Sequence, residues 1–224
     1  MIKKQGALLT ETHLHTTIGS SCGIVDPVET IRLYRDAGYN AIIVTDHYYG
    51  KTWDKYHKTA DDWLDGYRTV RDLGKDAGIR VFLGMELRLK GAIDDFLVYG
   101  FDEKFLIKNN LIYELSLPEI FQLAEAYGFL VYQAHPFREG HVVRDPKFMH
   151  GVEVFNSRPR FASDNEKALA FAEENSLLMI AGGDFHSYED AGRSGVWLDE
   201  AIETEKELVE YLRTNELSRY MGLL

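Results

Sequence analysis

The chain alternates between short apolar segments and longer amphipathic segments, and this alternation limits its fold more than any other feature. The apolar segments have the length and composition of strands that are buried on one or both faces. Strands that alternate with helices favour a mostly parallel sheet with helices packed outside it. Seven strands are predicted, at residues 8–12, 41–45, 80–83, 96–99, 130–132, 152–155 and 178–180.

Helix signals fall between several of these strands. Asp26 can cap the first helix, with Pro27 in its first turn and Glu29 at the capping-box distance. An open doubly wound sheet and a closed barrel both fit this order of elements, and the positions of the polar residues favour the barrel. The predicted helices are residues 26–37, 60–77, 117–127, 164–175 and 204–214.

Histidines and acids gather at the ends of the predicted strands. In a parallel α/β barrel the loops that follow the strands form one face, so side chains there converge on a common centre. Six of the eight histidines would share that face, with His141 the least certain of the six by position. The groups at strand ends are His13, His15, Asp46, His47, Glu86, Asp94, Asp95, His135, Asn156, Arg158, Asp184 and His186.

The spacing within these groups suits metal binding. His13 and His15 are two residues apart, so in an extended strand they point the same way and can hold one ion together; Asp184 and His186 repeat this spacing. Imidazole and carboxylate are ligands for zinc, manganese or iron, and the Glu86 carboxylate can bridge two ions. Two ions roughly 3.5–4 Å apart can activate a water and stabilise phosphoryl oxygens. Each pair alone is a weak signal, but their joint placement predicts a polynuclear metal site.

Composition excludes several other classes of protein. The formal net charge of −11 disfavours non-specific binding to duplex nucleic acid. A single cysteine, Cys22, excludes a disulfide framework and a cysteine-based zinc module. No apolar run approaches the roughly 20 residues of a membrane span, and no secretory signal is recognisable. We expect one globular domain over residues 1–224, located in the cytoplasm, with no membrane partner; its oligomeric state is left open.

Five short motifs resemble, in the same order, those of the polymerase and histidinol phosphatase (PHP) superfamily. They are His13-Leu14-His15-Thr16, Thr45-Asp46-His47, Gly84-Met85-Glu86, His135-Pro136 and Gly183-Asp184-Phe185-His186. The resemblance implies a distorted (β/α)7 barrel, phosphoesterase activity and two or three divalent ions. It also implies a ligand set: His13, His15, Glu86 and Asp184 for the first ion, Glu86 and His135 for the second, and His47 and His186 for the third.

The chain departs from the family pattern at two places. Asp95 stands where the family commonly has a histidine, and as a ligand it would favour manganese or iron over zinc. Ser20, Ser21 and Cys22 stand where members with a full third site often carry another histidine. The third ion is therefore expected to bind weakly or to be completed by water or substrate, with Cys22 a bystander thiol in a loop.

Fixed cations are needed to recognise a phosphate. Arg158, Arg193 and Arg138 follow predicted strands and are the candidate substrate-binding residues. Residues 48–58 concentrate aromatic and basic side chains after the second strand. A base or ring could stack there, but packing of these aromatics against the barrel rim is favoured.

The sequence thus predicts a metal-dependent phosphoesterase that hydrolyses a small phosphomonoester. Glu86, Asp184 and His186 are the candidate catalytic residues, with His186 or a water as the group that protonates the leaving oxygen. Histidinol phosphate, a nucleotide and the end of an oligonucleotide all remain open as substrates. Two rival classes are a binuclear amidohydrolase and a non-catalytic metal-binding domain. The first often needs a lysine at a middle strand end, and none occurs at the end of the third, fifth or sixth strand.

Overall fold

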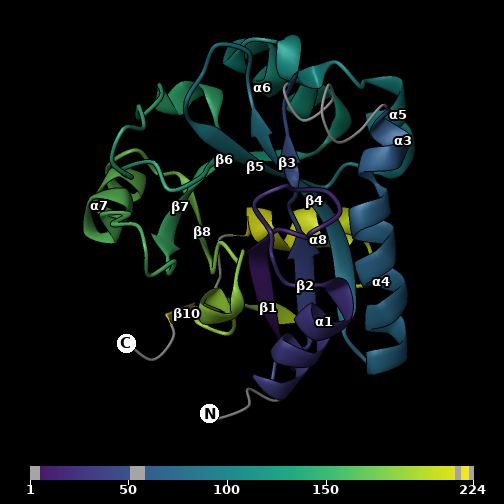
Figure 1. Ribbon diagram of the computed structural model, residues 1–224. Coiled ribbons are helices and arrows are strands. Elements are labelled where there is room, and N and C mark those ends of the chain that lie inside the picture. Colours follow the sequence, from purple (N-terminus) through teal and green to yellow (C-terminus); the bar gives the residue numbers. More distant parts are fainter. Residues whose placement is uncertain (1–5, 51–58, 215–217, 222–224) are drawn as a thin grey trace.

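Ten strands form one strongly curved sheet in the computed structural model, which describes residues 6–50, 59–214 and 218–221 (Figure 1). The strand order is β10-β9-β1-β2-β4-β5-β6-β7-β8, and the short β3 pairs with β4. The strands are β1 (Ala7–Leu14), β2 (Ala41–Val44), β3 (His47–Tyr48), β4 (Arg80–Arg88), β5 (Asp95–Tyr99), β6 (Leu130–Gln133), β7 (Gly151–Asn156), β8 (Leu178–Gly182), β9 (Ser194–Asp199) and β10 (Ser218–Met221).

The sheet closes on itself between the end of β1 and the residues that follow β8. Leu14 and Phe185 form a parallel bridge, and the Phe185 amide donates to the His13 carbonyl at 3.0 Å. The His15 amide donates in turn to the Phe185 carbonyl, also at 3.0 Å. The result is a nearly closed barrel, and the predicted fold class is confirmed.

Three strands of this barrel were absent from the prediction, and one runs against its expected direction. β3 has only two residues, β10 lies near the end of the chain, and β9 pairs antiparallel with β1, so none of them fits the expected alternation of parallel strands and helices. β5 pairs antiparallel with both β4 and β6, so the sheet is mixed rather than mostly parallel. Because β5 is reversed, its first residue, Asp95, lies at the same rim as the last residues of its neighbours.

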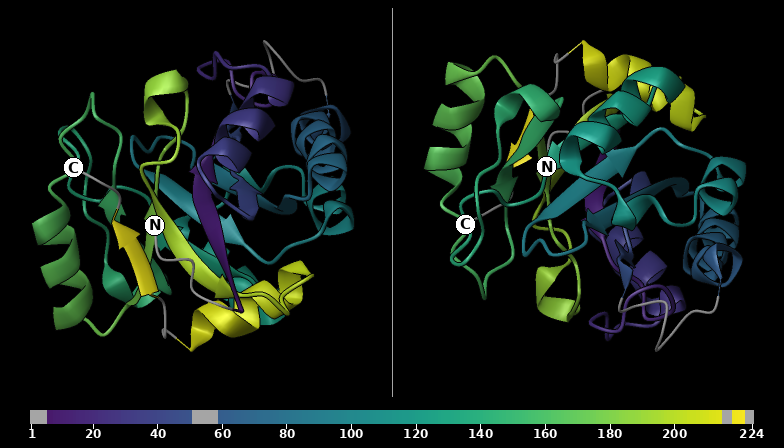
Figure 2. Two further views of the ribbon diagram at one scale, coloured as in Figure 1. Left: turned by 90° about the horizontal axis from the view of Figure 1, so that it is seen from below. Right: turned by 90° about the horizontal axis from the view of Figure 1, so that it is seen from above.

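The helices cover the outside of the barrel. α1 (Pro27–Asp36) lies beside α4 (Asp65–Ala77), while α7 (Asn165–Glu174) packs on β7 at the opposite side, as the views in Figure 2 show. The predicted helix 60–77 is divided at Leu64 into α3 (Ala60–Trp63) and α4. The other helices are α5 (Glu103–Lys108), α6 (Leu117–Tyr127) and α8 (Glu205–Arg213), with short 3-10 turns at Ile112–Glu114, Pro146–Phe148 and Tyr188–Asp190.

Several helices begin where the sequence offers a cap. The Asp26 carboxylate accepts hydrogen bonds from the amides of Val28 and Glu29, as its position before Pro27 predicts. Ser116 and Thr204 form capping boxes with acidic residues three positions later. These caps fix the helix ends and so the lengths of the loops at the barrel rim.

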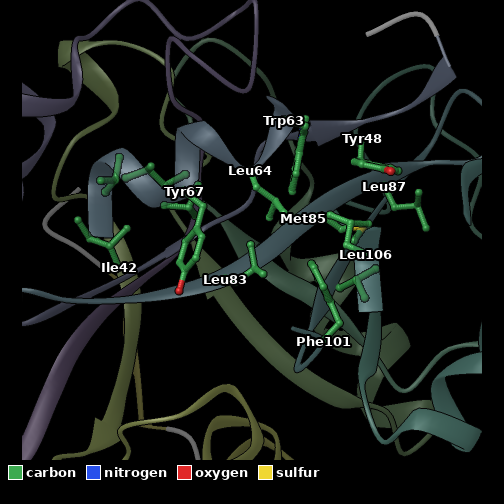
Figure 3. Packing of buried hydrophobic residues seen from close by; sticks show 14 of the residues in the cluster. Ile42, Tyr48, Trp63, Leu64, Tyr67, Leu83, Met85, Leu87, Phe101 and Leu106 are labelled. Atoms are coloured by element: carbon green, nitrogen blue, oxygen red, sulfur yellow. The ribbon is translucent and has the colours of Figure 1, made fainter. Parts of the chain in front are cut away.

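The largest hydrophobic cluster lies between the sheet and the helices α1, α3 and α4. Figure 3 shows Ile42 and Leu83 from neighbouring strands packed against Leu64 and Tyr67. Ile42 and Leu64 are fully buried, and burial of a side chain of this size contributes roughly 1.5–3 kcal/mol. The core thus holds the strands rigidly and fixes the polar groups at their ends. Among the described residues, no helix is long and apolar enough to cross a membrane.

Candidate metal centre

The polar strand ends predicted to meet do lie together at one rim of the barrel. His13 and His15 lie near the end of β1 and are fully buried, and Glu86 is buried near the end of β4. His47 begins β3, immediately after Asp46. His135 follows β6, and Asp184 and His186 follow β8. Residues up to 173 positions apart therefore share one small volume, although their roles as ligands stay predictions.

The Glu86 carboxylate is the centre of this group. Its Oε1 lies 3.1 Å from His135 Nε2 and 3.4 Å from His13 Nε2. Its Oε2 lies 2.8 Å from His47 Nδ1 and 3.2 Å from His15 Nε2. One carboxylate thus faces four imidazoles, the arrangement that a bridging ligand requires.

Asp184 is a second buried carboxylate that approaches the same histidine nitrogens. Its Oδ1 lies 3.6 Å from the Nε2 atoms of both His13 and His15, and 3.3 Å from His186 Nδ1. Nε2 of His13 and Nε2 of His15 therefore each lie near both carboxylates, and a cation among these atoms would contact imidazole and carboxylate together.

Four groups of side chains bring potential ligand atoms within 4.8 Å of one another. Two of them match the predicted first and second ions closely. A third joins Asp95 to His47 and Glu86, and the fourth joins Cys22 to His15, His47 and His186. The groups are His13, His15 and Asp184; His13, Glu86 and His135; His47, Glu86 and Asp95; and His15, Cys22, His47 and His186.

Several of these atoms are buried without a hydrogen-bond partner among the described residues. They include Nε2 of His13 and His15, Nδ1 of His47 and Oε2 of Glu86. Leaving a buried polar atom unpaired costs about 1–3 kcal/mol, so a cluster of them needs an explanation. Divalent cations satisfy imidazole nitrogens and carboxylate oxygens at once, and the residues present fit such ions.

Burial and neighbouring charges shift the pKa values of several groups in the cluster. Burial raises the pKa of Glu86 and Asp184, but neighbouring histidines outweigh it and hold both carboxyl pKa values well below their usual range. Burial lowers the pKa of His15 well below its usual value, and His186 and His47 add to this effect. Ionised carboxylates and a neutral imidazole are the forms of Glu86, Asp184 and His15 that bind metal.

Two of the predicted ligands have strained backbones. His135 has a φ of 29° and Asp184 a φ of 52°, both in the left-handed region that few side chains adopt. Such conformations persist where the surrounding structure fixes them and are frequent at functional sites. For Asp184, the turn is held by the preceding Gly183 amide, which donates to Glu11 Oε1 at 2.7 Å. A Cβ at position 183 would lie 2.4 Å from Glu11 Oε2, so only glycine fits.

A third buried carboxylate, Glu153, was missed by the sequence prediction. Its Oε1 lies 3.0 Å from His13 Nδ1, and its Oε2 accepts hydrogen bonds from the His135 amide and from Asn156 Nδ2. It therefore orients two predicted ligands from behind. A signal was present, because Glu153 is a lone charge inside the apolar strand 152–155.

We expect Glu153→Gln to weaken metal binding by about 10–100-fold, because the neutral amide no longer fixes the His13 ring and its basicity. Competition with a chromogenic chelator would measure the affinity. Glu125→Gln is the matched control, since Glu125 pairs with His150 outside the site at 2.9 Å. Equal affinities for the wild-type chain and Glu153→Gln would contradict the positioning role.

Asp95 and Asp94 have arginine partners. Both Asp95 oxygens accept hydrogen bonds from Arg88, at 2.7 and 2.6 Å, while the carboxylate stays within reach of His47 and Glu86. Asp94 is bound in the same bidentate way by Arg144, and so belongs to a different ion pair. Asp95 remains a candidate ligand, whereas the ion pair of Asp94 with Arg144 stabilises the start of β5.

Two of the three predicted arginines line the site. Arg138 Nη2 donates to Asp184 Oδ2 at 2.6 Å, and Arg158 Nη1 lies 3.6 Å from the same oxygen. Both guanidinium groups stack over the Phe161 ring, at 5.1 and 4.9 Å from its centroid. Arg193 is not brought to the site: it is exposed, its Nε donates to the Glu189 carbonyl, and it does not line the cavity.

Part of this site lines a cavity of about 300 Å³, whose wall includes His47, Glu86, His135, Asp184, His186 and the two arginines. His141 lies at its wall, with its ring 4.9 Å from that of His135. A separate cavity of about 590 Å³, lined by Tyr49, Tyr113 and Lys90 among others, shares Arg88 with it. Of the aromatic loop 48–58, Tyr48 is buried against Trp63, as rim packing predicts, and residues 51–58 lie outside the described residues.

Comparisons with known proteins agree with this architecture. A family model described as PHP-associated matches residues 162–217. An uncharacterized protein of Methanocaldococcus jannaschii is 33% identical over an alignment of 97 residues, and the match covers 38% of this chain and 41% of that protein. The aligned segment thus spans less than half of this relative.

Solved structures share the fold across almost the whole chain. A two-domain protein from Bacteroides vulgatus, described as containing a PHP-like metal-dependent phosphoesterase, superposes with a TM-score of 0.69 at 20% identity. The match covers 97% of this chain and 66% of that one. The lesion-specific endonuclease PfuEndoQ from Pyrococcus furiosus gives a TM-score of 0.60 at 14% identity, over 96% of this chain and 57% of that one. The barrel is therefore PHP-like, as the motifs predicted.

Proposed function

We propose that this chain, whose barrel is that of the PHP-like metal-dependent phosphoesterases, is a metal-dependent hydrolase that acts on a small phosphomonoester. The observation that carries the proposal is a cluster of five histidines and two buried carboxylates beside one cavity of about 300 Å³, whose wall includes Arg138 and Arg158. The name of the Bacteroides vulgatus protein points to the same class of reaction.

Each part of the site has a role in this reaction. His13, His15, Glu86, His135 and Asp184 would hold two divalent cations, and His47 and His186 would contribute to a third. Divalent cations held there supply the acidity that makes water a nucleophile near pH 7, and they offset the charge of the phosphoryl group. Zinc, manganese and iron all suit this mixture of imidazole and carboxylate.

The arginines would bind the phosphoryl oxygens. Arg138 and Arg158 both point at Asp184 Oδ2, and each retains a buried Nε with no hydrogen-bond partner among the described residues. Guanidinium groups suit phosphate because several N–H donors lie in one plane. Their stacking on Phe161 limits their rotation, which favours binding of a group in one orientation.

The size and charge of the site favour a small substrate. A cavity of about 300 Å³ is at the lower end of the range for small-molecule sites. The adjoining cavity beside Arg88 could take the organic part of the ester. A net charge of −11 disfavours a long nucleic-acid track, although a mononucleotide or the end of an oligonucleotide fits the same chemistry.

A substrate panel tests this proposal. The chain, loaded separately with manganese, iron and zinc, is assayed for phosphate release from an aryl phosphate, histidinol phosphate and nucleoside monophosphates, with a bis-aryl phosphodiester for comparison. We expect kcat/KM for the best monoester to exceed that for the diester by at least about tenfold. Stoichiometric metal binding without turnover of any ester would instead support a non-catalytic domain.

A further inference from the structure

Cys22 lies beside the metal centre, although the sequence led us to expect a bystander thiol. Its Sγ lies within 4.8 Å of a ring nitrogen of each of His15, His47 and His186. Cys22 also lines the same cavity as Glu86 and Asp184. The thiol thus lies next to His47 and His186, the predicted ligands of the third ion, for which the sequence offers no further histidine.

The loop that carries Cys22 is held against the barrel rim by its own hydrogen bonds. Asp46 accepts from the amide and the hydroxyl of Thr16, both at 2.7 Å, at the start of the loop. Ser20 Oγ accepts from the His47 amide at 2.8 Å, in the middle of the loop. The Ile24 amide donates to the His186 carbonyl at 2.9 Å, at its end. The loop is therefore tied to the same two segments that supply His47 and His186.

Close packing inside the loop restricts the backbone next to Cys22, whose side chain is exposed. A Cβ at Gly23, the next residue, would lie 2.7 Å from the Thr16 carbonyl oxygen, so this position requires glycine. The fixed backbone on both sides holds the thiol at the rim. Its position is a consequence of the fold and not of a free loop conformation.

The histidines around Cys22 present ring nitrogens to this space. His15 is fully buried, its Nδ1 lies 3.2 Å from Ser20 Oγ, and its Nε2 has no hydrogen-bond partner among the described residues. His186 Nδ1 lies 2.8 Å from the Asp184 carbonyl oxygen, which leaves its other nitrogen for a ligand. Backbone and side-chain contacts at one ring nitrogen commonly orient the other toward a metal.

We propose that Cys22 is a thiolate ligand of the third cation, together with His47 and His186, and that this site prefers zinc to manganese. On binding, a bond forms between Sγ and the cation, and the thiol proton passes to solvent. Sulfur and imidazole donors suit zinc, whereas manganese prefers oxygen. The inference depends on the metal centre of the proposed function but not on its substrate.

Cobalt substitution tests the ligation directly. The metal-stripped chain is loaded with Co²⁺, and its near-ultraviolet absorption is compared with that of Cys22→Ala, Cys22→Ser and the control Ser21→Ala, which alters the exposed neighbouring residue. We expect a sulfur-to-cobalt charge-transfer band in the wild-type chain and in Ser21→Ala, and no such band in either Cys22 variant. A wild-type cobalt complex without the band would overturn the proposal.

Two further measurements do not depend on the spectrum. Elemental analysis of zinc-loaded protein should find one ion fewer per chain in Cys22→Ala than in Ser21→Ala, with far-ultraviolet circular dichroism to confirm folding. Because Cys22 is the only cysteine, a thiol reagent reports on it alone, and zinc should slow its reaction by at least about tenfold. Equal ion counts, or equal thiol reactivity with and without zinc, would contradict ligation. If these measurements succeed and no phosphoester is cleaved, the proposed function fails and the ligand assignment stands.

Discussion

Replacing His13 and Asp184 together by alanine is expected to lower phosphomonoester hydrolysis by at least about 10³-fold. The two side chains lie 3.6 Å apart and face the same group of buried ring nitrogens, so the double variant removes both sides of the first ion's predicted site. Loss of that ion removes the acidity of the nucleophilic water, an effect of several kcal/mol on the barrier. Initial rates with a generic aryl phosphate, at saturating metal, provide the measurement.

The control for this variant removes the same kinds of group elsewhere. His150 and Glu125 also form a histidine–carboxylate pair, 2.9 Å apart, and neither residue lines the cavity. His150→Ala combined with Glu125→Ala should keep the metal content and most of the activity. The double variant at positions 13 and 184 should bind at least one ion fewer. If it instead hydrolyses the aryl phosphate as fast as the wild-type chain, the metal-centre hypothesis is wrong.

Arg138→Ala is expected to lower kcat/KM by about 10²–10³-fold, the usual effect of removing one fixed donor to a developing charge. Arg138 is the better placed of the two arginines, because it is 2.6 Å from Asp184 Oδ2 and its side chain is only 11% exposed. Arg138 Nη2 also donates a hydrogen bond to Asn156 Oδ1 at 3.1 Å, which fixes the guanidinium further. Arg138→Lys should recover part of the loss, since it restores charge without the planar pair of donors.

Arg193→Ala separates this interpretation from a general effect of positive charge. In the sequence, Arg193 follows a strand-end motif, Asp184-Phe185-His186, much as Arg138 follows His135. Its guanidinium nevertheless donates to the Glu189 carbonyl and does not line the cavity. We expect Arg193→Ala to change kcat/KM by less than about twofold, because substitutions of most exposed residues have small effects. An unchanged kcat/KM in Arg138→Ala, or an equal loss in Arg193→Ala, would exclude the proposed phosphate-binding role.

Residues at the ends of the predicted strands could be placed from sequence because strand direction fixes where a side chain can lie. The two-residue spacing of His13 and His15 and the position of Glu86 after an apolar run were sufficient to place them at a shared rim. His135 and Asp184 followed by the same rule. Contacts between the five side chains are those that this rule predicts, and their function as ligands stays to be tested.

Other features depend on contacts that no local pattern encodes. The reversal of β5 follows from its pairing with β4 and β6, and only this pairing explains why Asp95 begins a strand yet lies at the rim. Arg193 has the sequence context of a substrate ligand, but the turn at residues 188–190 directs it to solvent. Cys22 reaches the histidines because four hydrogen bonds hold its loop against the rim, and their partners are distant in sequence.

The point at which the sheet closes coincides with the candidate metal centre. Only a few backbone hydrogen bonds join β1 to the segment after β8, and they involve His13, His15 and Phe185. Any cation shared by His13 and Asp184 would therefore act as a cross-link between the two edges of the barrel, comparable to a zinc clip in a small domain. Chemistry and architecture would then depend on the same ion, so that its loss would both stop turnover and loosen the contact between β1 and the segment after β8.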